Sequence, residues 1–213
     1  MFSMIVLKFE KTGTAALVSH VDNLRAVTYI LRRAGINAEY SQGFNPHMEL
    51  GFSSPIALGV ESLAEYVSVK TECSEQLLDK LNAVSPQGIK FTKLFNAEVN
   101  LASTLNKATY QVQAKGLGEV IGEITQPNYE ICYLDRGQSV VKNVSGRIFD
   151  ACRLDADTAQ VTLAIGNDNL RPDRLVTHLM TKHNLTGDYR ITKLQAYVND
   201  IPADEYLQSL QQQ

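Results

Sequence analysis

The order in which predicted strands and helices follow one another constrains this chain most. Residues 2–9 are rich in β-branched and aromatic side chains and predict a strand, and 19–35 has the apolar spacing of an amphipathic helix. A strand at 36–41, a strand at 65–72, a helix at 74–84 and a strand at 89–97 follow. The resulting order, β-α-β-β-α-β, is that of a ferredoxin-like unit.

The second half of the chain repeats this order with an additional strand. Strands are predicted at 108–115, 128–134, 137–144 and 188–198, with a hairpin that turns at Asp155–Asp157. A weak helix interrupted by glycines is predicted at 116–126, and a clear helix begins near Pro172. The two halves share negligible residue identity, so the repeat rests on element order alone. We therefore predict an α+β chain of two tandem ferredoxin-like halves, with antiparallel sheets and a cleft between them.

The predicted boundaries divide the chain into four parts. Residues 1–97 form a first ferredoxin-like domain that carries a long motif loop at 41–59. Residues 98–107 fit neither the helix nor the strand period and predict a linker. A second ferredoxin-like domain occupies 108–199, and 200–213 are expected to form a flexible tail.

Composition narrows the class of protein. The net charge of −3 argues against a protein covered in basic charge, although it leaves room for a local basic patch. Cys73, Cys132 and Cys152 are far apart and lack C-x-x-C spacing, which disfavours disulfides, iron–sulfur clusters and structural zinc. Reduced thiols predict a cytoplasmic protein. The sequence has no apolar run of the length that spans a membrane, so no membrane association is expected.

Common catalytic signatures are missing from the sequence. It contains no G-x-x-x-x-G-K-[ST], G-x-G-x-x-G, G-x-S-x-G or H-E-x-x-H motif. His20, Asp22 and His47 lack the local spacing of a metal site. We therefore expect no metal and no cofactor. The absent motifs argue against an enzyme but leave the question open, and His20 and His47 are the candidate catalytic residues should the chain be one.

The predicted start of the first helix offers one candidate site. Ser19 and Asp22 fit a capping box, and Gly35 fits a helix terminator. His20 takes the first helical position, where free N–H groups and the positive end of the dipole suit phosphate binding or acid catalysis. The simpler interpretation is a half-exposed histidine beside an ordinary cap.

Two groups of arginines offer further candidates. Asn23, Arg25 and Arg32 are expected to lie away from the apolar stripe of the first helix, toward solvent. Arg25, Arg32 and Arg33 form either a basic strip that grips phosphates or a solvated face whose last arginines complement the dipole. Arg171 and Arg174 begin a later helix, where cations are unfavourable unless an anion is bound. The alternative for this pair is an ordinary surface turn set by the intervening proline.

The loop "YSQGFNPHMELGFSSPIALG" combines turn residues with polar and aromatic side chains. Gln42, Asn45 and His47 offer donors and acceptors, and Tyr40 and Phe44 offer flat faces for stacking a base. Two interpretations stay open, since the loop either contacts a ligand or is an Ω-loop whose aromatic residues pack it onto the sheet.

The segment "FEKTG…SHVDNLRAVTYILRRAGINAEYSQGFNPHMELGFSSPIALGVESLAEYV" resembles the bacterial radical-SAM-linked domain of unknown function. That family occurs as a free-standing protein or fused behind a radical SAM enzyme. The matching positions are Phe9, Lys11, Gly13, Ser19, His20, Asp22, Arg25, Arg32, Arg33, Tyr40, Ser41, Gly43, Phe44, Asn45, Pro46, His47, Gly59, Ser62 and Glu65.

The resemblance implies association with radical SAM chemistry and, through gene proximity to ribonuclease G, with RNA or ribosome metabolism. The chain lacks the C-x-x-x-C-x-x-C cluster motif and is therefore not itself that enzyme. Family members often carry Pro and Lys after the motif histidine, whereas this chain has Met48 and Glu49. This charge reversal argues against a phosphate at that rim of the loop.

Two hypotheses follow. In the first, the chain is an accessory protein that binds RNA or another anionic substrate for a partner radical SAM enzyme. In the second, it is a metal-independent endoribonuclease of the tandem ferredoxin-like type, by fold-level analogy. Both expect His20 and His47 to share one open pocket. The substrate-binding residues of the first hypothesis are Lys11, His20, Arg25, Arg33, Tyr40, Gln42, Phe44, Asn45, His47 and Arg171.

Overall fold

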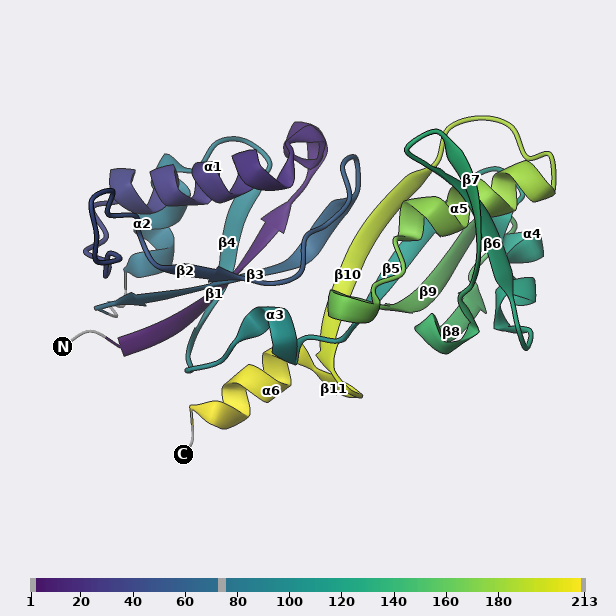
Figure 1. Ribbon diagram of the computed structural model, residues 1–213. Helices are drawn as coiled ribbons and strands as arrows, with labels where there is room; N and C mark the ends of the chain where they lie inside the picture. The colour runs from purple at the N-terminus through teal and green to yellow at the C-terminus, as the bar shows by residue number, and fades with distance from the viewer. Residues whose placement is uncertain (1–2, 73–75, 212–213) are drawn as a thin grey trace. The chain divides into compact units, whose positions relative to one another are not determined.

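The computed structural model describes residues 3–72 and 76–211 and has a mixed α+β fold (Figure 1). The chain divides into two compact units. Unit 1 comprises Met1–Leu105 and Tyr197–Gln213, and unit 2 comprises Asn106–Ala196. Unit 2 is therefore an insertion into unit 1, which needs both ends of the chain. No helix within the described residues is long and apolar enough to cross a membrane.

Unit 1 has the predicted order of strands and helices in its first part. Its elements are β1 (Ser3–Lys11), the 3-10 helix η1 (Gly13–Leu17), α1 (His20–Arg33), β2 (Leu50–Phe52), β3 (Glu61–Thr71), α2 (Leu77–Val84), β4 (Ile89–Asn96), α3 (Leu101–Thr104), β11 (Ile201–Pro202) and α6 (Ala203–Leu210). Strands β4, β1 and β3 are adjacent and antiparallel, and β2 pairs with β3. The Ser74 cap predicted for the second helix lies outside the described residues.

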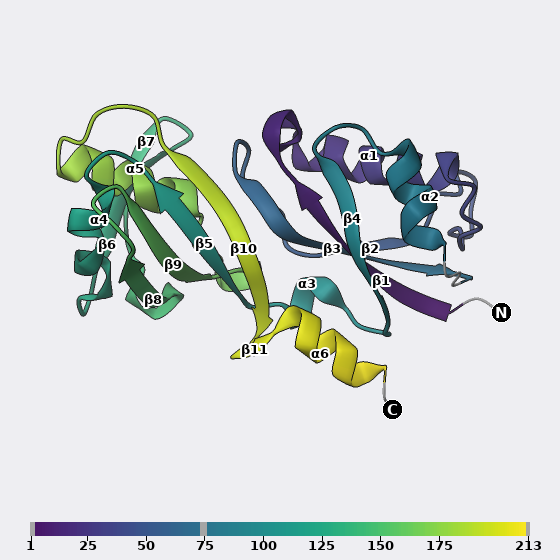
Figure 2. The same cartoon turned by 180° about the vertical axis from the view of Figure 1, so that it is seen from behind.

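The sheet of unit 1 is covered on both faces. Side chains alternate along a strand, and Ile5, Leu7 and Phe9 of β1 are fully buried in a core that includes Val27 and Leu31 of α1. Figures 1 and 2 show α1 and α2 on this face of the sheet, with α3 and α6 on the opposite side. Both faces of the sheet are therefore shielded from water.

The first helix begins and ends as its sequence predicts. The Ser19 hydroxyl accepts a hydrogen bond from the Asp22 N–H at 3.2 Å and donates one to the Asp22 carboxylate at 2.7 Å. At the other end, Gly35 adopts φ +69, and its N–H donates to Arg32 O while the Ile36 N–H donates to Leu31 O. This paired pattern is the Schellman motif that glycine permits without steric cost.

The strand predicted at 36–41 is wrong. This segment makes only isolated bridges, and the strand that pairs with β3 is β2, inside the region predicted as a loop. Gly51 explains why β2 lies at Leu50–Phe52, because a Cβ atom on residue 51 would lie 2.4 Å from the Ser68 hydroxyl oxygen. A residue without a side chain lets β2 approach β3, and this constraint appears only in the folded structure.

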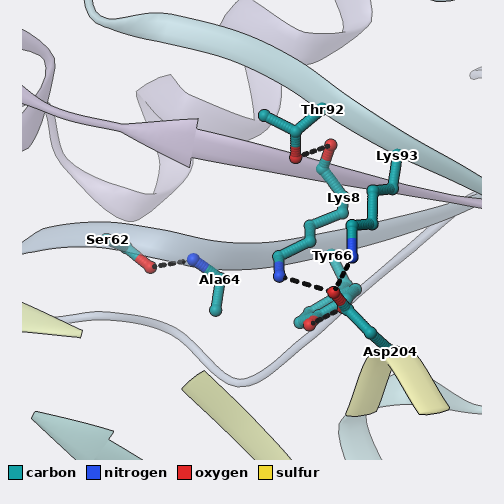
Figure 3. A network of polar contacts seen from close by, with 7 residues as sticks. All are labelled: Lys8, Ser62, Ala64, Tyr66, Thr92, Lys93 and Asp204. Atoms are coloured by element: carbon teal, nitrogen blue, oxygen red, sulfur yellow. Dashed lines mark hydrogen bonds and ion pairs between the residues drawn. The ribbon is translucent and has the colours of Figure 1, made fainter. Parts of the chain in front are cut away.

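The predicted flexible tail is also wrong, since α6 packs onto unit 1. Ala203 and Leu207 are buried. The Asp204 carboxylate accepts hydrogen bonds from Lys8 Nζ at 2.9 Å, Lys93 Nζ at 2.8 Å and the Tyr66 hydroxyl at 2.7 Å (Figure 3). Burial alone would raise the pKa of Asp204, but these three donors outweigh it and lower the pKa. The ion pairs and buried apolar groups hold the C-terminal segment in place.

The predicted linker is partly structured. Within 98–107, the short helix α3 buries Leu101, and Leu105 is buried after it. Asn100 caps α3 by accepting a hydrogen bond from the Ser103 N–H. The boundary between the units falls after Leu105. This segment therefore contributes to the core of unit 1 rather than only connecting the halves.

Unit 2 is a four-stranded sheet with a separate hairpin. Its elements are β5 (Lys107–Gln113), α4 (Leu117–Val120), η2 (Ile121–Thr125), β6 (Glu130–Asp135), β7 (Gln138–Asn143), η3 (Ser145–Arg147), β8 (Ile148–Arg153), β9 (Thr158–Ala164), η4 (Gly166–Asp168), α5 (Pro172–Lys182) and β10 (Arg190–Val198), whose last two residues belong to unit 1. The strand order is β10-β5-β9-β8, and β6 and β7 form a separate two-stranded sheet. Arg136 and Gly137 adopt φ +50 and +82 in the tight β6–β7 turn, as a two-residue hairpin turn requires.

Candidate functional site

Helix α1 presents a cationic and aromatic face to solvent. Arg25, Tyr29, Arg32 and Arg33 are exposed and lie at spacings of three, four and eight residues, which places them on one side of the helix. Tyr29 is 59% exposed, so its ring is available to a ligand rather than packed in the core. Arg25 pairs with Asp22 at 3.2 Å, and both side chains are largely exposed.

The motif loop lies next to the C-terminal end of this helix. The Arg32 guanidinium lies over the Tyr40 ring, 5.8 Å from its centroid. Such a contact is worth about 0.5–1 kcal/mol at an exposed site. It brings the ring of Tyr40 alongside the arginines, so the face of α1 continues into the loop.

The loop is closed by contacts between Ser41 and His47. The Ser41 N–H donates to His47 O at 2.9 Å, the His47 N–H donates to the Ser41 hydroxyl at 3.1 Å, and that hydroxyl lies 2.8 Å from His47 Nδ1. Met48 is buried, whereas Gln42 and Asn45 are exposed. The loop thus packs down at its base, as an Ω-loop does, and presents its tip to solvent.

Phe44 at the tip of the loop is the most exposed large apolar side chain of the described residues, at 107%. A phenyl ring left fully in water contributes nothing to the core, so the fold gives no packing reason for it. We name the exposed residues of α1 and the loop together the α1–loop face; its members are Arg25, Tyr29, Arg32, Arg33, Tyr40, Gln42, Phe44, Asn45 and His47.

A hollow of about 650 Å³ adjoins this loop. His47, Met48 and Phe52 line it from one side, and Met4 and Leu101 from another. The lining also contains two carboxylates, those of Glu49 and Glu98. These negative charges disfavour a phosphate, so the hollow suits an uncharged part of a ligand.

Lys11 and His20 lie at the other end of α1. Lys11 is buried, and its Nζ donates to Val18 O at 2.9 Å. Ser62 stands opposite Lys11 in the β1–β3 register and donates to the buried Glu65 carboxylate at 2.7 Å. Sequence positions about fifty residues apart in the motif thus come together as one polar cluster.

Burial affects the protonation of two members of this cluster. It lowers the pKa of Lys11, and the negative charge of Glu65 opposes the shift. Burial likewise lowers the pKa of His20, with Glu65 opposing and Lys11 reinforcing the effect. The shift favours the neutral form of the His20 imidazole. The prediction that Asn23 faces solvent is wrong, since this residue is buried in the first turn of α1. Its side-chain oxygen finds no hydrogen-bond donor among the described residues.

The structure does not bring His20 and His47 together. His20 begins α1, whereas His47 closes the loop that contacts Arg32 in the last turn. At about 1.5 Å of rise per residue, the 14 residues of α1 hold its two ends roughly 20 Å apart. The expectation of a shared pocket is wrong, and two imidazoles at this separation do not act on one reacting atom.

The remaining predicted residues divide among these regions. Arg25 and Arg33 belong to the α1–loop face, and Arg171 lies in unit 2 at the start of α5. Sequence reasoning missed Tyr29, although its position four residues after Arg25 indicates the same helix side. No group of His, Cys, Asp and Glu side chains that fits a metal ion occurs within residues 3–72 and 76–211.

The fold and this surface define a two-unit α+β protein with an exposed cationic and aromatic face. The profile of a family described as "Uncharacterized protein conserved in bacteria (DUF2344)" matches residues 4–172, and the chain belongs to this family. The matched span includes the whole α1–loop face. A search of functionally curated proteins gives no match. The predicted bacterial family of unknown function is thus confirmed, whereas its link to radical SAM enzymes stays a prediction.

Proposed function

We propose that this chain is a non-catalytic binding module for single-stranded RNA, which it holds for a partner radical SAM enzyme. The observation that carries the proposal is the α1–loop face. Arg25, Arg32 and Arg33 are exposed on one side of α1, and Arg32 contacts Tyr40 of the loop that exposes Phe44. A row of cations beside flat rings is the arrangement that binds a flexible polyanion with exposed bases.

The arginines would meet the phosphates. Arg25 and Arg33 are eight positions apart on α1, a span of about 12 Å. Their cations therefore follow an extended backbone rather than surround one group. The ion pair between Arg25 and Asp22 is exposed and worth about 0–1 kcal/mol, so a phosphate displaces it at little cost. Three phosphate contacts correspond to a salt slope of about −2 for a single strand.

The loop would meet the bases. Tyr40 and Phe44 supply stacking surfaces, each worth about 1–3 kcal/mol per base. Gln42, Asn45 and His47 are exposed beside them and supply hydrogen-bond groups for base edges. The carboxylates of the adjoining hollow repel phosphate, which favours a base at this end of the surface.

The proposed partner, a radical SAM enzyme, rests on the resemblance to radical-SAM-linked proteins alone, not on a contact in the structure. We also propose that both units are variants of the ferredoxin-like plan. The strand order β4-β1-β3-β2 in unit 1 and β10-β5-β9-β8 in unit 2 supports this, with the β6–β7 hairpin as an addition. The endoribonuclease alternative loses its acid–base pair, because His20 and His47 lie at opposite ends of α1.

Fluorescence anisotropy with a labelled single-stranded RNA, measured over a range of salt concentrations, tests the proposal. Replacing Arg25, Arg32 and Arg33 by alanine should weaken binding at least tenfold and flatten the salt slope by about 2. A matched control replaces three exposed lysines elsewhere, Lys80, Lys90 and Lys115. Equal losses in both triple variants, or binding that ignores salt, would contradict the α1–loop face as the RNA site.

A further inference from the structure

Unit 2 contains a pocket that the proposed function does not use. It encloses about 230 Å³, and four cationic side chains from different segments line it. Lys142 comes from β7, Arg147 from η3, and Arg171 and Arg174 from α5. Because three separate segments supply these cations, their convergence is not the by-product of one helix face.

The rest of the lining suits an oxyanion. Tyr133 lies beneath the Arg174 guanidinium, 4.0 Å from ring centroid to Cζ, which holds the planar group in position. Asn167 and Asn169 add amide groups. None of the described residues that line the pocket carries a carboxylate. A hollow lined by donors and cations, without acids, has a positive potential inside.

The carboxylates that pair with these cations are outside the lining. Arg174 contacts Asp135 at 3.2 Å, and Arg171 contacts Asp173 through its Nε at 3.0 Å. The Arg147–Asp168 distance is 3.9 Å, and the Asp168 side chain is 86% exposed. The pairs of Arg147 and Arg174 are single, partly exposed contacts worth about 0–1 kcal/mol, so they leave these two guanidinium groups available to a ligand. Arg171 is held more firmly, because its Nε and one terminal nitrogen both donate to the Asp173 carboxylate.

The Lys142 side chain has no acidic partner among the described residues. It makes no hydrogen bond or ion pair with any of them, and the residue is exposed where it lines the pocket. Its ammonium group is therefore available to a ligand without breaking an existing contact. Of the four cations it is also the one whose removal disturbs the fold least.

The start of α5 contributes the positive end of the helix dipole, which the Asp173 carboxylate in the first turn partly offsets. Arg171 is the N-cap and makes no capping hydrogen bond with its side chain, and Arg174 lies in the first turn. Cations at this end of a helix oppose the dipole. A bound anion would reverse that unfavourable term and would also accept from the free N–H groups of the first turn.

We propose that this pocket binds a phosphate group, either free or as the terminal phosphate of a small ester. Guanidinium groups from Arg147, Arg171 and Arg174 match the oxygens of a tetrahedral phosphate, and Lys142 closes the mouth. The volume admits one phosphate and part of its ester, not a folded polyanion. This site is independent of the α1–loop face, since it shares no residue with it.

Backbone amide NMR of the full chain tests the proposal at constant ionic strength, with inorganic phosphate, pyrophosphate and adenosine 5′-monophosphate as probes. Saturable shifts should appear in 142–147 and 167–175 with each probe. Lys142→Ala should weaken binding roughly threefold to tenfold, since one charge-assisted contact at an exposed position is lost. Arg147→Ala should weaken it by a similar factor.

Two controls make the result decisive. Lys115→Ala removes an exposed cation elsewhere in unit 2 and should leave phosphate affinity unchanged. Adenosine without phosphate should cause no shift at the pocket. Absence of saturable shifts, equal affinity in Lys142→Ala and the parent protein, or binding of adenosine alone would overturn the assignment. RNA binding by the α1–loop face is measured through variants of other residues. The phosphate proposal and the RNA proposal can therefore each be disproved without the other.

Discussion

Each unit holds one carboxylate that accepts hydrogen bonds from three donors, and the two differ in how far along the chain those donors lie. In unit 1, Asp204 joins Lys8, Tyr66 and Lys93, and Lys8 is 196 positions away. In unit 2, the three donors to the corresponding carboxylate lie within 60 positions of it.

The unit 2 carboxylate is that of Glu123. It accepts from the Tyr129 hydroxyl at 2.7 Å and from Lys182 Nζ at 3.0 Å, and it lies 2.9 Å from His183 Nε2. Its interactions connect η2 to the end of α5, all within one continuous segment. We therefore expect unit 2 to fold on local contacts, whereas unit 1 should need contacts between the two ends of the chain.

Truncation after Asn199 should destabilise unit 1 more than any other change considered, while leaving unit 2 folded. It removes α6 with the buried Ala203 and Leu207 as well as the Asp204 carboxylate. The buried apolar groups and the ion pairs together contribute more than about 4 kcal/mol to the free energy of unfolding of unit 1. Hydrogen exchange should show loss of protection in β1, β3 and β4 while β5 and β9 keep theirs.

Exposed Glu205→Ala in the full-length chain serves as the control and should leave protection unchanged. If the truncated chain kept full protection in β1, the idea that the C-terminal segment closes unit 1 would be wrong. If β5 lost protection to the same extent, the independence of unit 2 would be wrong instead.

Replacing Asp204 by alanine tests the carboxylate itself. Removing one member of a largely buried ion pair costs about 3–5 kcal/mol, and the partial exposure of Lys93 reduces this to about 2–4. The measurement is chemical unfolding followed by a probe in unit 1. Exposed Glu205→Ala in the same helix is the matched control and should cost less than about 0.5 kcal/mol.

The pH dependence of the same interaction has a definite sign. The donors hold the pKa of Asp204 below its unfolded value of about 3.9, so the stabilisation is complete above that pH and is lost as pH falls through the folded pKa. Unit 1 of the parent protein should therefore lose stability steeply below pH 4. The Asp204→Asn variant should lose less stability over the same pH range. Identical stability–pH profiles for the variant and the parent protein would contradict the role of the Asp204 carboxylate.

In unit 2, Glu123→Gln should have a smaller effect. Glutamine keeps the shape and one acceptor but removes the charge that faces Lys182 and His183, at a cost of about 1–2 kcal/mol. Unfolding monitored by a unit 2 probe measures it, with exposed Glu130→Gln as the control. A loss in unit 1 equal to that in unit 2 would contradict the local character of this network.

The same contrast explains what the sequence could predict. The limits of α1 depend on Ser19, Asp22 and Gly35, which act on their neighbours, and they were predicted correctly. The position of β2 depends on a close approach of Gly51 to Ser68. The C-terminal segment is held in place by the hydrogen bond from Lys8 to Asp204. Neither long-range contact leaves a periodic signal in the sequence.

The candidate site divides in the same way. The exposed arginines of α1 follow from helix periodicity alone, and the sequence places them correctly on the solvent side. The prediction that His20 and His47 share a pocket assumed that the loop at 41–59 returns to the start of α1. In the structure the loop stays at the C-terminal end beside Arg32, and a contact between a loop and a helix is not encoded by spacing.

Phe44→Ala should have the smallest effect on stability and the clearest effect on binding. A fully exposed side chain makes no core contact, so the free energy of unfolding should change by less than about 0.5 kcal/mol. Loss of one stacked base should weaken RNA binding by about 1–3 kcal/mol without changing the salt slope, because no phosphate contact is removed. Phe149→Ala, an exposed ring of unit 2, is the matched control for RNA affinity. A changed salt slope in Phe44→Ala would mean that the loop acts through charge, and an unchanged affinity would remove the loop from the binding surface.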